Sequence, residues 1–416
     1  MCTNWQNYLT TFSRLGKRAV GLNRIDALLK ALGSPQKSLE FIHVTGTNGK
    51  GSICEMLSEI FTRSGYKTGL FTSPYIAEYN DRIRINGQNI PDEALEALLP
   101  KVKAAAESTG FVLDFSQFEI TQAAAFCYFS QQKCDIVILE AGLGGLLDST
   151  NVIERNVCSV IGSVSFDHMA VLGDTLEEIA FQKAGIIKPG CPCVLSPCAD
   201  ARVIKVFEQT AREKGAELVI PDMESIKRLG SGLDNSFYFD GIKAYKGEYH
   251  PKMAGDHQIR NALSVIYACN FADREYDIGL PALRDGIENA CVLGRAQIVS
   301  DYPLTIIDGG HNPDAGAALA QVLSAEGGGF TALIGMSADK SIADYIKAVM
   351  PYIDEFICTD DFSERALEKS ELAKIIISCG GRAQTAESLS SGLETIRKAP
   401  KGLICGSLFL VAAVQG

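Results

Sequence analysis

The sequence lacks an apolar run of about 18 residues, the length that a helix needs to cross a bilayer. The nearest approach, Leu403–Val414, is too short and is interrupted by Gly406. Residues 1–15 also lack the apolar core of a secretory signal. We therefore expect no membrane partner and no export.

An excess of positive charge is also missing. Lys and Arg number 39 against 50 Asp and Glu, which gives a net charge of −11. An acidic chain is poorly suited to binding nucleic acid through its phosphates. The expected partner is a small molecule whose charge is met locally by a few cations.

The 13 cysteines are odd in number and dispersed from Cys2 to Cys405. Together with the missing export signal, this pattern is typical of reduced thiols in a cytoplasmic protein. Hydrophobic residues make up 46% and charged residues 21% of the 416 positions. Such a composition excludes wholesale disorder and indicates two or three globular domains.

Short apolar runs alternate with amphipathic stretches, which predicts a mostly parallel sheet covered by helices. The pattern predicts strands at Leu39–Val44, Asp135–Glu140 and Asn156–Ser165, and helices at Ser52–Ser64 and Leu176–Ile186. It restarts near Val292, with a strand at Leu304–Ile307 and a helix at Asp314–Ser324. We therefore predict a larger domain over residues 1–292 and a smaller α/β domain over 293–416.

The sharpest local motif is Gly46-Thr47-Asn48-Gly49-Lys50-Gly51-Ser52, here called the phosphate loop, which lies between a predicted strand and a predicted helix. Glycines allow backbone N–H groups to turn inward, the helix N-terminus adds partial positive charge, and Lys50 adds a full one. Val44 stands where the usual motif has its first glycine. Phosphate binding is favoured over a plain glycine-rich turn, and the motif by itself indicates only a nucleotide.

Several polar residues follow predicted strands, where α/β sheets bind ligands. Glu140 ends one strand and suits magnesium or substrate, although it could instead cap the next turn. His168 follows another strand, and on sequence alone an ordinary loop residue is favoured there. Lys183 lies within a predicted helix, where a solvated lysine is the default. His311 stands in a turn-rich cluster, and Arg295 could equally bind a nucleotide or form an ion pair.

Taken together, ten segments in family order make the chain resemble folylpolyglutamate synthase and dihydrofolate synthase, which are Mur-ligase-like ATP-dependent amide ligases. The segments are Gly21–Ile25, His43–Ser52, Phe71–Pro74, Leu139–Asn151, Asp167–Gly190, His257–Ala262, Gly294–Arg295, Asp308–Pro313, Gly335–Lys340 and Gly406–Ser407. The resemblance implies a P-loop NTPase-like sheet domain followed by a Rossmann-like glutamate ligase domain.

The resemblance also implies a role for each matching residue. Catalysis would involve Lys50, Lys183 and His311. ATP would be bound by Gly49, Lys50, Gly51, Ser52, Asn261, Arg295 and Asp308. Metal ligands would be Ser52, Ser73, Glu140 and His168. The folate or dihydropteroate substrate would contact Gln117, Phe118, Glu119, Leu147, Asp148 and Ser149.

The cofactors implied are ATP and two Mg²⁺ ions, with a monovalent cation as a further candidate and a carbamylated Lys183 as a ligand. The co-substrate would be L-glutamate, and we expect a monomer. Three positions depart from the family pattern: Tyr75 replaces a histidine, Leu146 an arginine and Gln182 a glutamate. They affect the substrate loop and leave the predicted metal and phosphate contacts intact.

Three alternatives to a folylpolyglutamate synthase stay open. The enzyme could be a strict or bifunctional dihydrofolate synthase. It could act on a nucleotide-linked cell-wall precursor, although only about 40 residues precede the phosphate loop, fewer than a typical domain. It could also be a nucleotide-dependent switch protein with no need for glutamate.

Overall fold

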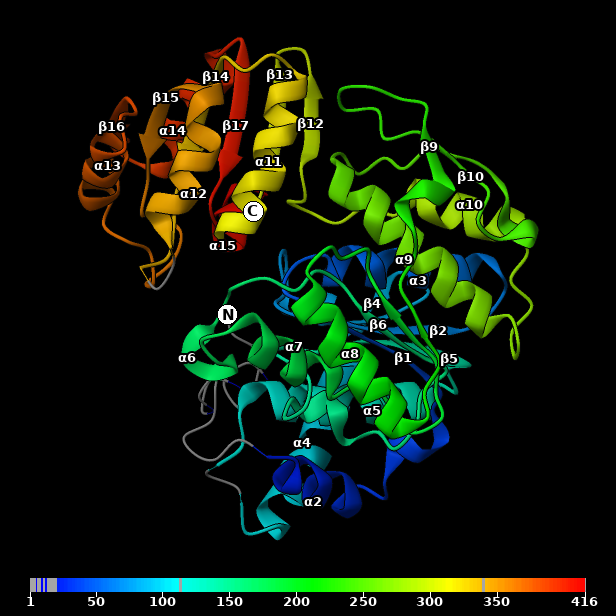
Figure 1. The fold of residues 1–416 in the computed structure, drawn as a ribbon. Coiled ribbons are helices and arrows are strands. Elements are labelled where there is room, and N and C mark those ends of the chain that lie inside the picture. Colours follow the sequence, from blue (N-terminus) through cyan, green and yellow to red (C-terminus); the bar gives the residue numbers. More distant parts are fainter. Residues whose placement is uncertain are drawn as a thin grey trace. The chain divides into compact units, whose positions relative to one another are not determined.

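The computed structural model describes Trp5, Leu9, Phe12 and residues 21–111, 114–338 and 341–415. Asp339 and Lys340, which belong to one of the family-like segments, lie outside the described residues. The chain forms two compact units (Figure 1). Unit 1 comprises Met1–Ser225 and Asn261–Ile287, and unit 2 comprises Ile226–Arg260 and Glu288–Gly416.

Unit 1 is built on an eight-stranded sheet with the order β4-β3-β2-β5-β1-β6-β7-β8. Six of these strands are parallel, and β3 and β4 form an antiparallel edge. The strands are β1 (Phe41–Thr45), β2 (Thr68–Phe71), β3 (Ile83–Ile85), β4 (Gln88–Asn89), β5 (Ile136–Glu140), β6 (Cys158–Ile161), β7 (Cys193–Leu195) and β8 (Leu218–Val219).

Helices cover both faces of this sheet. A buried core packs α2, α4 and α5 against Phe41, Phe71 and Leu139, while α3 packs against β1, β2 and β5 on the other face (Figure 1). The helices that lie wholly or partly in unit 1 are α2 (Asn23–Ala31), η1 (Pro35–Ser38), α3 (Lys50–Arg63), η2 (Tyr79–Arg82), α4 (Asp92–Ser108), α5 (Gln117–Gln131), η3 (Ser149–Val152), α6 (Met169–Leu172), α7 (Leu176–Ala184), α8 (Ala201–Lys214), η4 (Met223–Ser225), α9 (Asp256–Ala272) and α10 (Leu280–Asn289).

The central strands form where the sequence predicts them, because strands covered on both faces need continuous apolar runs. All five residues of β1 and all five of β5 are buried. The predicted strand Asn156–Ser165 is wrong at its C-terminal end, since β6 stops at Ile161. Beyond it, the amide groups of Gly162 and Ser163 donate to carbonyls of Thr45 and Asn48. The chain there turns onto the phosphate loop and leaves the sheet.

Unit 2 contains a six-stranded sheet with the order β12-β13-β17-β14-β15-β16, in which only β12 is antiparallel to its neighbour. A separate three-stranded antiparallel sheet has the order β11-β10-β9. The strands are β9 (Ile226–Arg228), β10 (Phe237–Phe239), β11 (Gly247–Tyr249), β12 (Gln297–Asp301), β13 (Leu304–Asp308), β14 (Phe330–Ile334), β15 (Ile353–Cys358), β16 (Ala383–Thr385) and β17 (Lys401–Cys405).

The helices of unit 2 surround a second core, in which α11 and α12 pack against each other and bury Leu319, Leu323, Tyr345 and Ile346 (Figure 1). They are η5 (Lys243–Tyr245), α11 (Pro313–Ala325), α12 (Ile342–Val349), η6 (Met350–Tyr352), α13 (Lys369–Ser378), α14 (Leu389–Lys398) and α15 (Leu408–Gln415).

The predicted α/β class with mostly parallel sheets is confirmed. The division at residues 292 and 293 stays a prediction, and contacts group Ile226–Arg260 with the C-terminal residues. Among the described residues, no helix is both long and apolar enough to cross a membrane.

Candidate functional site

The phosphate loop joins β1 to α3 and closes tightly around Gly49. This residue has a φ of 87°, in the region that favours glycine. A Cβ at Gly49 would lie only 2.6 Å from Oδ1 of Asn261, so the Asn261 amide can approach the loop backbone only because Gly49 has no side chain. The ammonium group of Lys50 donates to the carbonyls of Gly46 at 2.9 Å and Thr47 at 3.2 Å. The loop therefore brings Gly49, Lys50 and Asn261 together.

Residues that follow β6 hold the phosphate loop from its other side. The Thr47 amide donates to the Ser163 carbonyl at 2.6 Å, and the Thr47 hydroxyl donates to the Ser165 carbonyl at 3.0 Å. The Asn48 amide donates to Oγ of Ser163 at 3.1 Å. Because Asp167 and His168 come directly after this segment, the same bonds fix where that predicted pair begins.

Lys183 is buried, with 2% of its surface exposed, so the sequence-based default of a solvated lysine is wrong. Burial and then the positive charge of Lys50 lower its pKa from 10.5 to about 7, while Asp167 acts in the opposite direction. A neighbouring loop packs closely against the backbone of the same helical turn. The Leu146 amide donates to the Gln182 carbonyl at 2.6 Å, and Gly145 packs so closely that a Cβ there would lie 3.0 Å from the Lys183 carbonyl oxygen.

The predicted metal ligands are only partly brought together. Glu140 ends β5 with 3% exposure, and one of its carboxylate oxygens accepts the Ser73 amide at 3.3 Å. Ser52 is buried in the first turn of α3. His168 has a φ of 49° and a 44% exposed side chain, with its Nε2 3.9 Å from Oδ1 of Asp167. Among the described residues no three His, Cys, Asp or Glu side chains form a metal-holding group.

The predicted substrate residues at the start of α5 have different surroundings. The Phe118 ring lies 5.5 Å from the Phe71 ring, and a Cβ at Gly142 would lie 3.0 Å from it. Glu119 is buried and already engaged, because it accepts from the Ser116 amide at 2.8 Å and pairs with Arg24 at 3.3 Å. Gln117 is the first residue of the helix. Phe118 is thus packed where β2 ends and the loop after β5 begins.

Residues 141–152, here called the β5 loop, contain Leu147, Asp148 and Ser149 and are held by their own side chains. The Asp148 carboxylate accepts the Leu143 amide at 2.8 Å and the Thr150 hydroxyl at 2.5 Å. Ser149 donates to Oε1 of Gln122 at 2.5 Å. Leu147, in contrast, is 41% exposed.

Two residues of β1 that the sequence analysis did not single out also hold the β5 loop. The Thr45 hydroxyl donates to the Gly144 carbonyl at 2.5 Å. Nε2 of His43 lies 2.9 Å from the Thr150 hydroxyl, which itself donates to Asp148. His43 must therefore be the donor, consistent with a pKa lowered to about 3 by burial and then by Lys188. Two polar residues spaced two apart in an apolar strand are the signal that could have found them.

Unit 2 holds the remaining predicted residues in one cluster after β13. The Asp308 carboxylate accepts hydrogen bonds from the Ala296 amide at 2.9 Å and the Gly310 amide at 2.8 Å. The first of these bonds holds Asp308 next to the backbone that immediately follows Arg295. Nδ1 of His311 lies 3.3 Å from the Gly309 carbonyl. Arg295, Asp308 and His311 therefore share one end of the unit 2 sheet.

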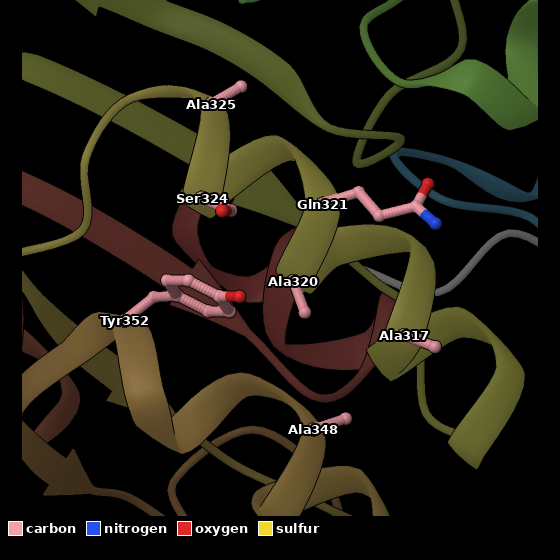
Figure 2. Close-up of a pocket in the computed structure, with 7 residues that line it drawn as sticks. All are labelled: Ala317, Ala320, Gln321, Ser324, Ala325, Ala348 and Tyr352. Atoms are coloured by element: carbon pink, nitrogen blue, oxygen red, sulfur yellow. The ribbon is translucent and has the colours of Figure 1, made fainter.

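A hollow of about 550 Å³ in unit 2 is lined by none of the predicted site residues. Figure 2 shows it along the later turns of α11, opposite Ala348 and Tyr352. His311 and the capping residue Asn312 lie at the other end of that helix. This hollow gives no reason to move the predicted site.

A nucleotide-type loop, a buried carboxylate at a strand end and a buried low-pKa lysine define an ATP-dependent ligase of the Mur type. The Mur ligase middle domain matches residues 44–269, and the Mur ligase glutamate ligase domain matches residues 294–412. The chain therefore belongs to the Mur ligase family.

Within this family, the chain is similar to folate enzymes. The chain is 33% identical to the dihydrofolate synthase/folylpolyglutamate synthase of Bacillus subtilis, over 95% of this chain and 94% of that protein. It is also 33% identical to the folylpolyglutamate synthase of Lacticaseibacillus casei, over 98% of this chain and 96% of that protein. The resemblance inferred from the motifs is thereby confirmed.

Solved structures agree. E. coli FolC in complex with DHPP and ADP matches with a TM-score of 0.87 at 28% identity, covering 100% of this chain and 97% of that one. A Yersinia pestis bifunctional folylpolyglutamate synthase/dihydrofolate synthase complexed with AMPPNP and a Mn ion matches with a TM-score of 0.85 at 27% identity, covering 99% and 96%.

Proposed function

We propose that this protein uses ATP to join the amino group of L-glutamate to the carboxylate of a reduced folate. The alternative is a dihydrofolate synthase, which joins L-glutamate to dihydropteroate, or a bifunctional enzyme with both activities. The relatives carry both names. In either case an acceptor carboxylate attacks the γ-phosphate of ATP to form an acyl phosphate. The glutamate amine then displaces phosphate and forms an amide.

The observation that carries the proposal is the grouping of three features within unit 1. The phosphate loop brings Lys50 beside buried Lys183, whose pKa responds to the Lys50 charge. Glu140 lies near the start of the same loop, since it pairs in register with Val44 of β1, two residues before the phosphate loop begins. A plain nucleotide switch needs the phosphate loop and has no need for a buried, readily deprotonated lysine.

The residues fit ATP by their donors. Gly49 offers a backbone N–H where no side chain fits, and Lys50 now bonds to the loop carbonyls Gly46 and Thr47, which a phosphate oxygen would replace. From unit 2, Arg295 and Asp308 remain the proposed nucleotide contacts, and His311 a proposed catalytic residue. The Asn261 amide remains a further nucleotide contact.

Divalent metal use is supported by the Mn ion named for the Yersinia pestis structure. A bound Mg²⁺ would neutralise phosphate charge during transfer. Ser52, Ser73, Glu140 and His168 remain its proposed ligands, and their hydroxyl and carboxylate oxygens suit a hard cation. We keep two magnesium sites and a monovalent cation within the proposal.

Lys183 is proposed to act as a carbamate. Carbon dioxide reacts with an uncharged amine, and a pKa of about 7 leaves roughly half of this amine uncharged at pH 7. The product is an anion, which would carry oxygen ligands where the free side chain carries a cation. This supports the proposed second metal site.

Gln117, Phe118, Glu119, Leu147, Asp148 and Ser149 remain the proposed acceptor-binding residues. The Phe118 ring, flanked by Phe71 and Gly142, offers an aromatic surface for a flat pteridine or benzoyl group. Asp148 and Glu119 act chiefly by holding the local backbone, as their hydrogen bonds indicate. A monomeric, cytoplasmic protein completes the proposal, and the 12 described cysteines are all free thiols.

Incorporation of labelled L-glutamate decides between the candidates. Purified protein is assayed with MgATP and either dihydropteroate or tetrahydrofolate. Product from tetrahydrofolate alone identifies a folylpolyglutamate synthase, and product from dihydropteroate alone identifies a strict dihydrofolate synthase. Product from both identifies a bifunctional enzyme. A third reaction with a UDP-linked cell-wall precursor tests that alternative. A rate of ATP hydrolysis that is unchanged by either glutamate or pteridine would contradict the proposal and favour a switch protein.

A further inference from the structure

Arg82 is a buried cation whose charge is not matched by the protein. Only 9% of its surface is exposed. Within the described part of the chain, its Nε is buried without a hydrogen-bond partner, and no carboxylate there forms an ion pair with it. The undescribed residues of unit 1 contain no Asp or Glu. Buried arginines are normally paired, so this one points to an anion from outside the chain.

Two aromatic rings flank the guanidinium group. Its central carbon lies 5.3 Å from the Tyr75 ring centroid and 5.2 Å from the Tyr79 ring centroid, and the two rings are 5.7 Å apart. Such contacts stabilise a cation, and the guanidinium also forms a hydrogen bond with the Tyr79 side chain. Its remaining N–H groups, Nε among them, can bind an anion in the plane of the group. A planar guanidinium between rings is suited to a carboxylate on an aromatic ring.

Neighbouring acidic side chains are occupied elsewhere. Asp81 accepts backbone amides of Ile76 and Ala77, both at 2.9 Å. Glu119 is taken by Arg24, and Glu140 accepts the amide of Ser73. None of these carboxylates can turn to Arg82 without leaving a backbone donor or another arginine unpaired.

The position of Arg82 links it to the proposed acceptor site. Its carbonyl accepts the Thr72 amide at 3.0 Å, one residue before Ser73. The Tyr79 hydroxyl pairs with the Thr121 hydroxyl of α5, one helical turn after Phe118. Tyr75 is also the position at which this sequence departs from the histidine usual in the family.

We propose that Arg82, held between Tyr75 and Tyr79, binds the carboxylate of the acceptor acid. This inference rests on the proposed function, because that function supplies a pteridine-bearing carboxylic acid as a substrate. In dihydropteroate, the acceptor of the alternative activity, that carboxylate lies on an aromatic ring. Arg82 then acts as a binding residue for the acceptor, and Tyr75 sets the orientation of the Arg82 guanidinium plane.

If Arg82 binds the carboxylate, removing the carboxylate from the ligand and removing the cation from the protein should not change the binding affinity independently. The probes are dihydropteroate, which has one carboxylate, and its neutral carboxamide. Binding to the whole protein is measured by isothermal titration calorimetry. We expect the native protein to bind the acid at least ~10-fold more tightly than the amide, the scale of a charged hydrogen bond. In Arg82→Met this preference should disappear, and in Arg82→Lys it should be reduced.

Arg84 provides a matched control two residues along the chain. It forms a two-point ion pair with Glu55, at 3.1 and 2.6 Å. Arg84→Met should therefore keep the native preference for the acid while lowering the melting temperature, because it leaves Glu55 unpaired. Arg82→Met should have a melting temperature equal to or above the native value, because it removes an unmatched buried charge.

The possible outcomes distinguish a failure of this inference from a failure of the proposed function. An unchanged acid-to-amide ratio in Arg82→Met, or loss of its folding, overturns the role of Arg82 even if the native protein ligates glutamate. Absence of both pteridine binding and glutamate incorporation in the native protein overturns the proposed function itself.

Discussion

The buried amine of Lys183 predicts an unusual dependence of stability on pH. Folding lowers its pKa from 10.5 to about 7, chiefly through burial. Between these pH values the unfolded chain keeps a proton that the folded chain releases, so stability rises with pH across this window. Below about pH 7 the folded protein must bury the charge, at a cost of about 5 kcal/mol.

The test replaces the amine with an apolar side chain of similar length. Lys183→Met should be more stable than the native protein by about 5 kcal/mol at pH 6. The difference should then shrink by about 1.4 kcal/mol per pH unit above pH 7, reaching about 2 kcal/mol at pH 9. Urea unfolding from pH 6 to pH 9, in buffer free of CO₂, magnesium and nucleotide, measures it.

The exposed Lys205 of α8 provides the control, since Lys205→Met removes an amine that folding does not bury. A stability difference for Lys183→Met that stays constant from pH 6 to pH 9 would refute the reasoning, because the buried amine would then have lost no proton on folding. In the native protein, added ¹³CO₂ should give a carbamate signal by NMR that is absent from Lys183→Met.

Three further changes test the site. Lys50→Ala should lower turnover by at least ~10²-fold in the glutamate-incorporation assay, the scale of losing one transition-state donor. Gly49→Ala would place a Cβ 2.6 Å from Oδ1 of Asn261, and should raise the KM for ATP by ~10-fold in steady-state kinetics, with less effect on the KM for glutamate. Thr45→Val removes the hydrogen bond to the Gly144 carbonyl, and calorimetry should show a melting temperature lower by about 2–4 °C, from about 1 kcal/mol.

The sequence predicts those parts of the fold that depend on local periodicity. Continuous apolar runs mark β1 and β5, and helical spacing marks α3, because burial on both faces or on one stripe imposes those patterns. The three-residue strands β9 and β10 carry no such pattern. They pair with each other, and β10 also pairs with β11, about ten residues away in sequence. Strands this short are too brief for alternation to mark them.

In the candidate site, too, some residues can be predicted from local sequence and others cannot. Gly49 and Lys50 are identified by a motif, because the phosphate loop is a local structure. Lys183 is buried in a helix whose backbone packs against Gly145 and Leu146, about 40 residues away in sequence, and no local pattern predicts this burial. Arg82 also escapes a pattern-based analysis, since only the folded loop reveals that its neighbours leave it without an acid.

Lys183 and Arg82 are both buried cations, but only lysine can lose its proton within the accessible pH range. Each is a cation buried within unit 1 at a cost to stability, and neither gains a carboxylate ion pair among the described residues. A fold selected for stability alone would favour apolar side chains of similar volume at both positions. Lysine can escape the cost by losing its proton, which leaves a reactive amine. Arginine cannot lose its proton at any accessible pH, so its cost is relieved only when an anion binds. One position therefore favours covalent modification and the other favours recognition of an acid, and both requirements are those of a ligase that activates a carboxylate.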